Sequence, residues 1–173
     1  ILEEMESAKE RGAHIYGEVL GSGSTADAHH ITAPAPGGDG ALRCMQLAIE
    51  DAGLSSNDIA SVNAHGTSTP LNDAAEAEAL SKLFGDNGPP VTSTKGITGH
   101  ALGAAGAIEA TAVLLSFIHK QIPPTSGFTT PDDEMAEFNL VTGSPQDWEP
   151  GPSMSNSFGF GGHNGSIVLA PTE

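Results

Sequence analysis

The feature that most constrains the fold is a long apolar segment that runs from about residue 100 to residue 119. Between Ala101 and Ile118 nearly every side chain is apolar or small, and the only charged one is Glu109. A helix at a protein surface has one apolar stripe and a polar opposite face. Since this segment is apolar around its whole circumference, we expect a central helix that is covered on every side.

A membrane-spanning helix is the alternative interpretation of this segment, because about 18 apolar residues reach the length that crosses a bilayer. Gly103, Gly106 and Glu109 in its middle make insertion unfavourable. The formal net charge of −16, from 6 basic and 22 acidic side chains, repels anionic lipids and nucleic-acid phosphates. The sequence also lacks a secretory signal pattern. We therefore expect a soluble cytoplasmic protein, with neither a membrane nor a nucleic acid as its partner.

The rest of the chain alternates helices and strands, which is typical of the α/β class. The length of 173 residues suits one domain, 1–173. The chain begins with Ile1 rather than methionine and opens directly in a helical pattern, so we interpret it as a piece of a longer protein. The expected helices are 1–12, 40–52 and 70–84, the expected strands are 14–20, 59–64 and 165–170, and residues 21–24 form a loop.

Two histidines lie where the chain changes direction, which is where α/β folds place their sites. His65 follows the strand 59–64, and His100 begins the apolar helix. The positive end of a helix dipole disfavours an imidazolium ion, so we expect His100 to be a neutral hydrogen-bond donor suited to an oxyanion. The remaining histidines are more simply structural when taken singly.

Lys95 and Glu109 flank the start of the apolar helix. A buried carboxylate without a partner is costly, so we predict an ion pair between the two side chains. The alternative is an exposed lysine and a helix edge that meets water, and spacing alone does not decide between them. The hydroxyls of Thr67 and Thr69 follow His65 and are suited to binding a substrate, although Thr69 before Pro70 equally fits a helix N-cap.

The glycine-rich run 159–165 does not fit a phosphate-binding loop, because it lacks the G-x-G-x-x-G spacing and leads into a strand. Its glycines permit unusual backbone angles around Phe158 and Phe160, which we expect to line or gate an apolar tunnel. A core position is the alternative for Phe158. Cys44 lies inside a helix without a neighbouring histidine, so we interpret it as a buried structural residue rather than a nucleophile.

Several short motifs follow one another along the chain. They are Asn63-Ala64-His65-Gly66-Thr67-Ser68-Thr69-Pro70, Ser93-Thr94-Lys95, Gly99-His100, Gly103 to Glu109, and Asn156-Ser157-Phe158-Gly159-Phe160-Gly161-Gly162. Taken together and in this order, they resemble the motifs of the β-ketoacyl-acyl-carrier-protein synthases, the type II condensing enzymes of fatty acid synthesis. The resemblance covers the whole chain but only the C-terminal half of those enzymes. It implies a thiolase-like fold, in which two similar α/β halves form five layers, αβαβα.

The resemblance also implies roles for individual residues. His65 and His100 become the catalytic pair, and Lys95 and Glu109 their charged support. The substrate-binding residues would be Thr67 and Thr69, which contact the phosphopantetheine arm, with Phe158 beside Phe160 and Phe160 as the gate. A structural monovalent cation is a weaker expectation, with oxygen ligands from Asn63, Glu109, Ser155 and Asn156.

In such enzymes a cysteine accepts the acyl chain from the acyl carrier protein, and malonyl-carrier protein loses carbon dioxide. The resulting carbanion attacks the thioester, while two neutral imidazoles stabilise the enolate oxygen. The family places that cysteine in the N-terminal half, so we expect this chain to be inactive without that half. We expect no cofactor, and a homodimer for the intact enzyme.

Two other readings of the same resemblance stay open. One is a non-catalytic subunit similar to a chain-length factor, and the other is the ketosynthase of a polyketide synthase. His163 stands where many relatives have threonine, and its effect is unassigned. The carrier protein is itself acidic, so we expect it to dock on basic residues of the other half rather than on Lys82 or Lys120.

Overall fold

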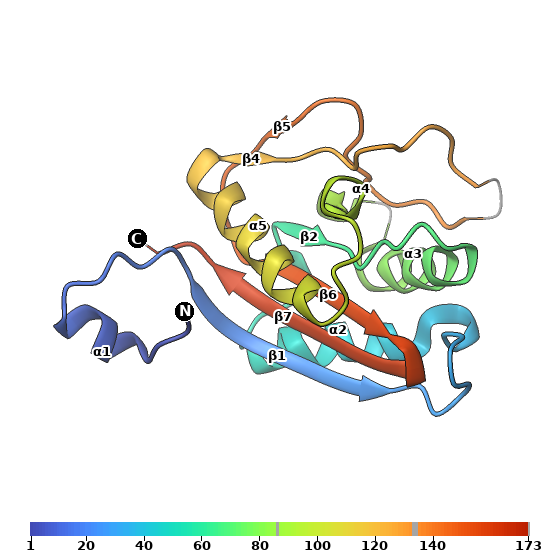
Figure 1. Ribbon diagram of the computed structural model, residues 1–173, viewed down its shortest axis with the longest axis horizontal. Coiled ribbons are helices and arrows are strands. Elements are labelled where there is room, and N and C mark those ends of the chain that lie inside the picture. The colour runs from blue at the N-terminus through green and yellow to red at the C-terminus, as the bar shows by residue number, and fades with distance from the viewer. Residues whose placement is uncertain (86, 133–134, 173) are drawn as a thin grey trace.

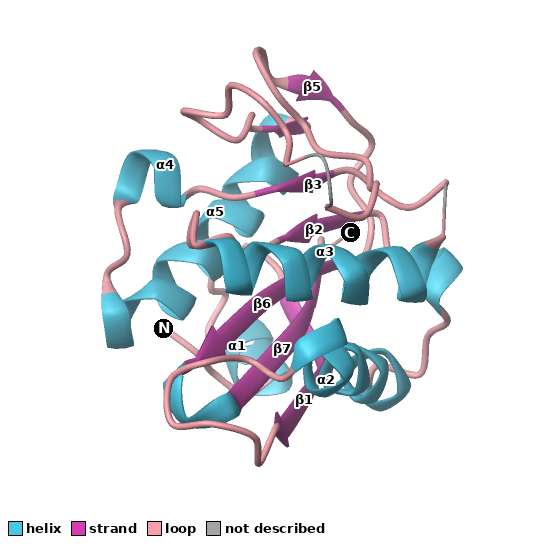
Figure 2. Cartoon of the chain, turned by 90° about the vertical axis from the view of Figure 1, so that its right-hand side faces the viewer, coloured by secondary structure: helices cyan, strands magenta, loops and turns pink. Residues whose placement is uncertain are grey.

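The computed structural model describes residues 1–85, 87–132 and 135–172, which form a mixed five-stranded sheet with helices on both faces (Figure 1). Figure 2 shows the strands in the order β1-β7-β6-β2-β3, with β1 lowest. The pairs β1–β7 and β7–β6 are antiparallel, whereas β6–β2 and β2–β3 are parallel. The strands are β1 Glu18–Ala26, β2 Ser61–Asn63, β3 Val91–Thr92, β6 Ser153–Gly159 and β7 His163–Ala170. The α/β class is therefore confirmed.

The longer helices cover the two faces of the sheet. Helices α2 (Asp39–Asp51) and α3 (Pro70–Phe84) lie on one face, and α5 (Ala105–His119) lies across the other, in front of β6 and β7 in Figure 1. Each face has its own hydrophobic cluster, the larger one around Met45, Leu80 and Met154 and the smaller one around Val113 and Phe117. The remaining elements are α1 Met5–Glu10, α4 Lys95–Thr98, β4 Gln121–Ile122, β5 Gln146–Asp147 and the short 3₁₀ turns Pro36–Gly38, Ser56–Asp58, Leu102–Ala104 and Phe160–Gly162.

The expectation of a helix from residue 100 that is enclosed on all sides is wrong for this chain. Helix α5 begins only at Ala105, after the 3₁₀ turn Leu102–Ala104. Its buried residues follow one stripe, whereas Leu115 and Ile118 are about half exposed, at 48% and 51%. The helix therefore buries one face against β6 and β7, and its opposite apolar face is not covered by any described residue of this chain.

The same segment, Leu102–His119, is the one candidate membrane span among the described residues, by length and composition alone. Only 28% of it is buried. Core helices of soluble proteins pass the same test. The Glu109 side chain in its middle is buried in an ion pair inside the molecule, which is an arrangement expected of a core helix.

The strand β1 corrects a second expectation, because it spans Glu18–Ala26 rather than residues 14–20. Gly21 and Gly23, expected in a loop, lie inside this strand. A Cβ atom on Gly23 would lie 2.8 Å from the backbone nitrogen of Ala48 in α2. These glycines therefore let the strand approach the helix backbone. The local sequence alone does not distinguish glycines of this kind from glycines in a loop.

Candidate functional site

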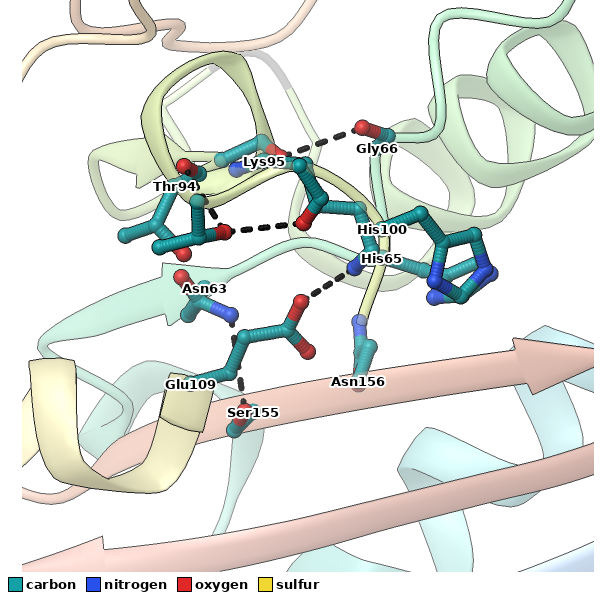
Figure 3. A network of polar contacts seen from close by, with 12 residues as sticks. Asn63, His65, Gly66, Thr94, Lys95, His100, Glu109, Ser155 and Asn156 are labelled. Carbon is teal, nitrogen blue, oxygen red and sulfur yellow. Dashed lines mark hydrogen bonds and ion pairs between the residues drawn. The ribbon is translucent and has the colours of Figure 1, made fainter. Parts of the chain in front are cut away.

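The site forms at the carboxyl ends of two neighbouring parallel strands. His65 follows β2, and Ser93 to Lys95 follow β3, while the turn after α4 returns His100 to the same place. The imidazole rings of His65 and His100 lie edge to face, with centroids 5.3 Å apart and planes at 84° (Figure 3). The structure thus brings together two side chains that are distant in the sequence.

The surroundings of His65 keep its ring neutral. The residue is only 6% exposed. Burial first, and then the electrostatic effects of Lys95 and His100, lower the pKa of His65 from 6.5 to about 4. Its Nδ1 atom has no hydrogen-bond partner among the described residues. At neutral pH the imidazole is therefore uncharged, with one buried ring nitrogen that no described residue occupies.

His100 does not lie at the end of a long helix, so the dipole argument for its neutrality is wrong. It is exposed and precedes the 3₁₀ turn that leads into α5. The backbone N–H of Leu102 donates to His100 Nδ1 at 3.2 Å. Because Nδ1 accepts, the proton of a neutral ring lies on Nε2, and this local hydrogen bond orients the donor in place of the dipole.

Lys95 and Glu109 form the predicted ion pair. Lys95 Nζ donates to Glu109 Oε1, and the two side chains are 5% and 1% exposed (Figure 3). The alternative of an exposed lysine is therefore wrong. A buried pair of this kind fixes a positive charge close to the His65 ring, since Lys95 is one of the groups that lower the pKa of His65.

The four oxygen-bearing residues of the expected cation site are buried but differ in what they offer. Asn63 Oδ1 and Glu109 Oε2 have no hydrogen-bond partner among the described residues, and the Asn63 amide nitrogen donates to Ser155 Oγ at 3.5 Å. Asn156 Oδ1, in contrast, already accepts from Ser166 Oγ at 2.8 Å. Two unpaired buried oxygens suit a hard cation or a water molecule, and the cation stays a prediction for Asn63 and Glu109.

Glu76 is a site residue that the sequence analysis missed. It is 3% exposed, and its carboxylate accepts the backbone N–H groups of His65 and Gly66 at 2.8 and 2.9 Å. Burial raises the pKa of this carboxyl group, against the effect of these hydrogen bonds. The sequence pattern could have indicated this residue. Glu76 lies on the same face of α3 as the buried residues Ala79 and Leu80, and a carboxylate on a buried face needs hydrogen-bond donors.

Thr67 and Thr69 lie between His65 and helix α3, and their hydroxyls contact each other. Thr67 Oγ1 and Thr69 Oγ1 lie 2.8 Å apart, and Thr69 is exposed. Thr69 is the N-cap residue of α3, but its side chain makes no capping hydrogen bond. Its hydroxyl is therefore not used to cap the helix, and it is accessible to a ligand.

The phenylalanines of the glycine-rich turn occupy different environments. Phe158 packs partly against the larger hydrophobic cluster, and its ring centroid is 6.1 Å from that of His65. Phe160 is 78% exposed at the start of the turn Phe160–Gly162. Phe158 thus combines the core position and the position beside the site, whereas Phe160 and the exposed His163 contact solvent.

Cys44 is buried within α2, as expected of a structural cysteine. Its Sγ donates to the carbonyl oxygen of Gly23 at 3.2 Å. Burial raises the pKa of the thiol, which disfavours a thiolate. The described residues therefore hold two imidazoles and a lysine–glutamate pair at the site, without a thiol beside them.

The site thus combines two adjoining imidazoles and a buried lysine–glutamate pair at the carboxyl ends of parallel strands, on a mixed sheet with helices on both faces. The family profile "Beta-ketoacyl synthase, C-terminal domain" matches residues 16–129. The fold is the C-terminal half of the thiolase-like architecture, and the chain belongs to the β-ketoacyl synthase family.

Individual relatives agree with this assignment. The chain is 47% identical to the 3-oxoacyl-[acyl-carrier-protein] synthase 2 of Staphylococcus aureus (strain COL), over 100% of this chain and 42% of that protein. The solved ishigamide ketosynthase/chain length factor superposes with a TM-score of 0.93 at 37% identity, over 99% of this chain and 42% of the other. A type II polyketide ketosynthase in complex with its acyl carrier protein, AntDE:AntF, gives 0.91 at 34% identity, over 99% and 42%. The chain thus spans less than half the length of these relatives.

Proposed function

We propose that this chain is the histidine-bearing part of a 3-oxoacyl-[acyl-carrier-protein] synthase, an acyltransferase of fatty acid synthesis. The reaction is the decarboxylative condensation of malonyl-carrier protein with an acyl thioester. The observation that supports it most is the pair His65 and His100, whose rings adjoin at 5.3 Å between centroids. The low pKa of His65, about 4, supports a neutral donor at the pH of the cell.

Each site residue has a role in this proposal. The Nε2–H of His100 and the ring of His65 stabilise the enolate oxygen that forms when malonyl-carrier protein loses carbon dioxide. Lys95, held by Glu109, keeps His65 uncharged through its positive charge. Thr67 and Thr69 bind the phosphopantetheine arm of the carrier protein, and Phe160 gates the pocket. The reaction needs no bound cofactor.

The upstream part of the intact protein is the required partner of this chain. It supplies the cysteine nucleophile. Cys44 cannot take this role, because it is buried and burial raises the pKa of its thiol, which disfavours the thiolate. It also covers the exposed apolar face of α5, at Leu115 and Ile118, and so completes the five-layer architecture. The chain alone is then inactive, and the intact protein is a cytoplasmic homodimer.

The main experiment measures malonyl decarboxylation and condensation by the full-length protein. His65→Ala and His100→Ala should each lower kcat for decarboxylation by about 100-fold or more, as expected for the loss of one oxyanion donor. His14 lies outside the site, with its ring edge to face with that of Tyr16, so His14→Ala is the control and should leave kcat unchanged. Wild-type activity that survives both site substitutions would contradict the proposal.

A non-catalytic, chain-length-factor-like subunit is the second candidate, because the ishigamide structure pairs a ketosynthase with a chain length factor. A polyketide ketosynthase is the third and uses the same chemistry. The upstream sequence separates the first two, since a synthase must have the nucleophilic cysteine there. Measurement of kcat/KM for fatty acyl and polyketide thioesters distinguishes a fatty acid synthase from a polyketide ketosynthase.

Docking of the carrier protein should depend little on the basic residues of this chain. Lys82 is already paired with Asp39 and Glu78, and Lys120 with Glu149. We expect Lys82→Glu and Lys120→Glu to change the Kd for the carrier protein less than about twofold, measured by titration calorimetry. A loss of tenfold or more would place the docking surface on this chain.

A further inference from the structure

The inference concerns Ser93, which lies directly after β3 and whose hydroxyl links two loops of the site. Its Oγ donates to the carbonyl oxygen of Gly66 at 3.1 Å and accepts the N–H of Lys95 at 3.4 Å. The Ser93 N–H donates to Thr125 Oγ1 at 3.1 Å. Ser93 is 6% exposed. One small side chain thus joins the turn after His65 to the loop that bears Lys95.

The backbone of Gly66 is shaped for this contact. Its φ of +45° lies in the left-handed region, and a Cβ atom there would lie 2.6 Å from both Cβ and Oγ of Ser93. Only glycine allows this approach without strain. The N–H groups of His65 and Gly66 donate to Glu76, and the Gly66 carbonyl accepts from Ser93. The turn is therefore held from two sides, by α3 and by the loop after β3.

The Lys95 loop is held as firmly on its other sides. Lys95 Nζ is paired with Glu109, and Thr92 Oγ1 donates to the Pro123 carbonyl at 2.6 Å. Thr125 N–H donates to the Val141 carbonyl at 2.8 Å, which fixes the acceptor of the Ser93 N–H. Among the described contacts, the Ser93 hydroxyl is the side-chain group that connects this braced loop to the His65 turn.

We propose that Ser93 is a positioning residue for the condensation, which holds the His65 turn at a fixed separation from Lys95. This inference rests on the proposed function for its kinetic consequence, but the geometry can be tested without turnover. If the connection is lost, the His65 ring can move away from the Lys95 charge and toward solvent. Either movement takes the ring away from the place where it stabilises the enolate oxygen.

The experiment substitutes Ser93→Ala in the full-length protein, with Ser61→Ala as matched control. Ser61 is also 6% exposed, and its hydroxyl bonds Ser153 Oγ at 2.9 Å, away from the histidines. Ser93→Ala should lower kcat for malonyl decarboxylation about tenfold with KM changed less than twofold, the effect of one hydrogen bond that acts on positioning. Ser61→Ala should affect neither constant.

The second measurement is hydrogen–deuterium exchange of the backbone amides of His65 and Gly66 by NMR, which reports how firmly the turn is held. Exchange of these two amides should become about tenfold faster in Ser93→Ala and stay at the wild-type rate in Ser61→Ala. Thr125→Val, which removes the acceptor of the Ser93 N–H, should raise the exchange rate by a smaller amount and serves if Ser93→Ala does not fold.

The two readouts separate the two proposals. A wild-type protein that does not decarboxylate malonyl thioesters contradicts the proposed function, while amide exchange in the His65 turn still tests Ser93. Unchanged exchange in Ser93→Ala and Thr125→Val, or an equal change in Ser61→Ala, overturns the positioning role. Faster exchange together with the kinetic split supports both.

Discussion

At the scale of single residues, the site depends on charges and dipoles placed around one imidazole. His65 is buried beside the Lys95–Glu109 pair, and its backbone N–H is bound by the Glu76 carboxylate. His100 takes its orientation from one local hydrogen bond to the Leu102 N–H. The neutral form of His65 therefore depends on burial and nearby charge, and the tautomer of His100 on one hydrogen bond, rather than on the macrodipole of α5.

The low pKa of His65 predicts a pH dependence of stability. Because the folded value of about 4 lies below the unfolded value of 6.5, the contribution of His65 is fully present above pH 6.5. It is lost as the pH falls from 6.5 toward 4. We expect the full-length protein to lose about 2 kcal/mol more over this range than His65→Asn, measured by urea unfolding at each pH. Parallel curves for the two proteins would contradict this.

Glu76 predicts a stability effect from a change of a single atom. In Glu76→Gln, one carboxylate oxygen becomes an NH₂ group that faces a backbone N–H donor of His65 or Gly66. We expect the free energy of unfolding to fall by about 1–3 kcal/mol, since a buried donor loses its acceptor. Glu78→Gln, at a partly exposed position of the same helix, is the control and should change it by about 0.5 kcal/mol or less. Equal effects would argue against the role of Glu76.

At the scale of elements, the close contact of β1 with α2 depends on glycines in the strand. Gly23 lies opposite the α2 backbone, and its missing side chain is what allows this contact. The strand thereby brings Asp27 and the loop after it next to the glycine-rich turn, where the Asp27 N–H donates to the Gly162 carbonyl at 2.9 Å. The packing of this strand therefore also places the loops near the site.

This contact predicts a large cost for a small substitution. Gly23→Ala should lower the free energy of unfolding of the full-length protein by about 1–3 kcal/mol, because the added methyl group meets the backbone of a helix that cannot move aside. Ser24→Ala, exposed on the same strand, should have an effect close to zero. Chemical denaturation measures both, and similar values for the two variants would show that the strand tolerates the methyl group.

At the scale of the whole molecule, helix α5 leaves one apolar face exposed, as is unusual for a domain that folds alone. Its inner face packs against the sheet through Val113 and Phe117, while Leu115 and Ile118 point away from the described part of the chain. The chain spans 42% of its Staphylococcus aureus relative. Under the proposed function, the upstream half covers this face, and a helix between two layers would account for the unbroken apolar sequence.

If the upstream half covers this face of α5, a charged side chain there should destabilise the full-length protein. Leu115→Glu should destabilise the full-length protein by about 3 kcal/mol, since it buries an unpaired carboxylate between the halves. Gln46→Glu, on the exposed side of α2, should have little effect. Thermal unfolding of the two variants is the measurement, and an unchanged Tm for Leu115→Glu would mean that this face stays in water.

The sequence by itself determined the α/β class and the helix Pro70–Phe84, because periodicity and proline position are local properties. Its short motifs predicted candidate site residues, but not Glu76. It also predicted the pairing of Lys95 with Glu109, because a carboxylate in an apolar helix needs a cation. The tertiary structure decided the extent of β1, the true start of α5, and the contacts of Glu76 and Ser93 with the His65 turn. These depend on which backbone groups meet across the sheet, and such distances between remote residues leave no periodic trace in the sequence.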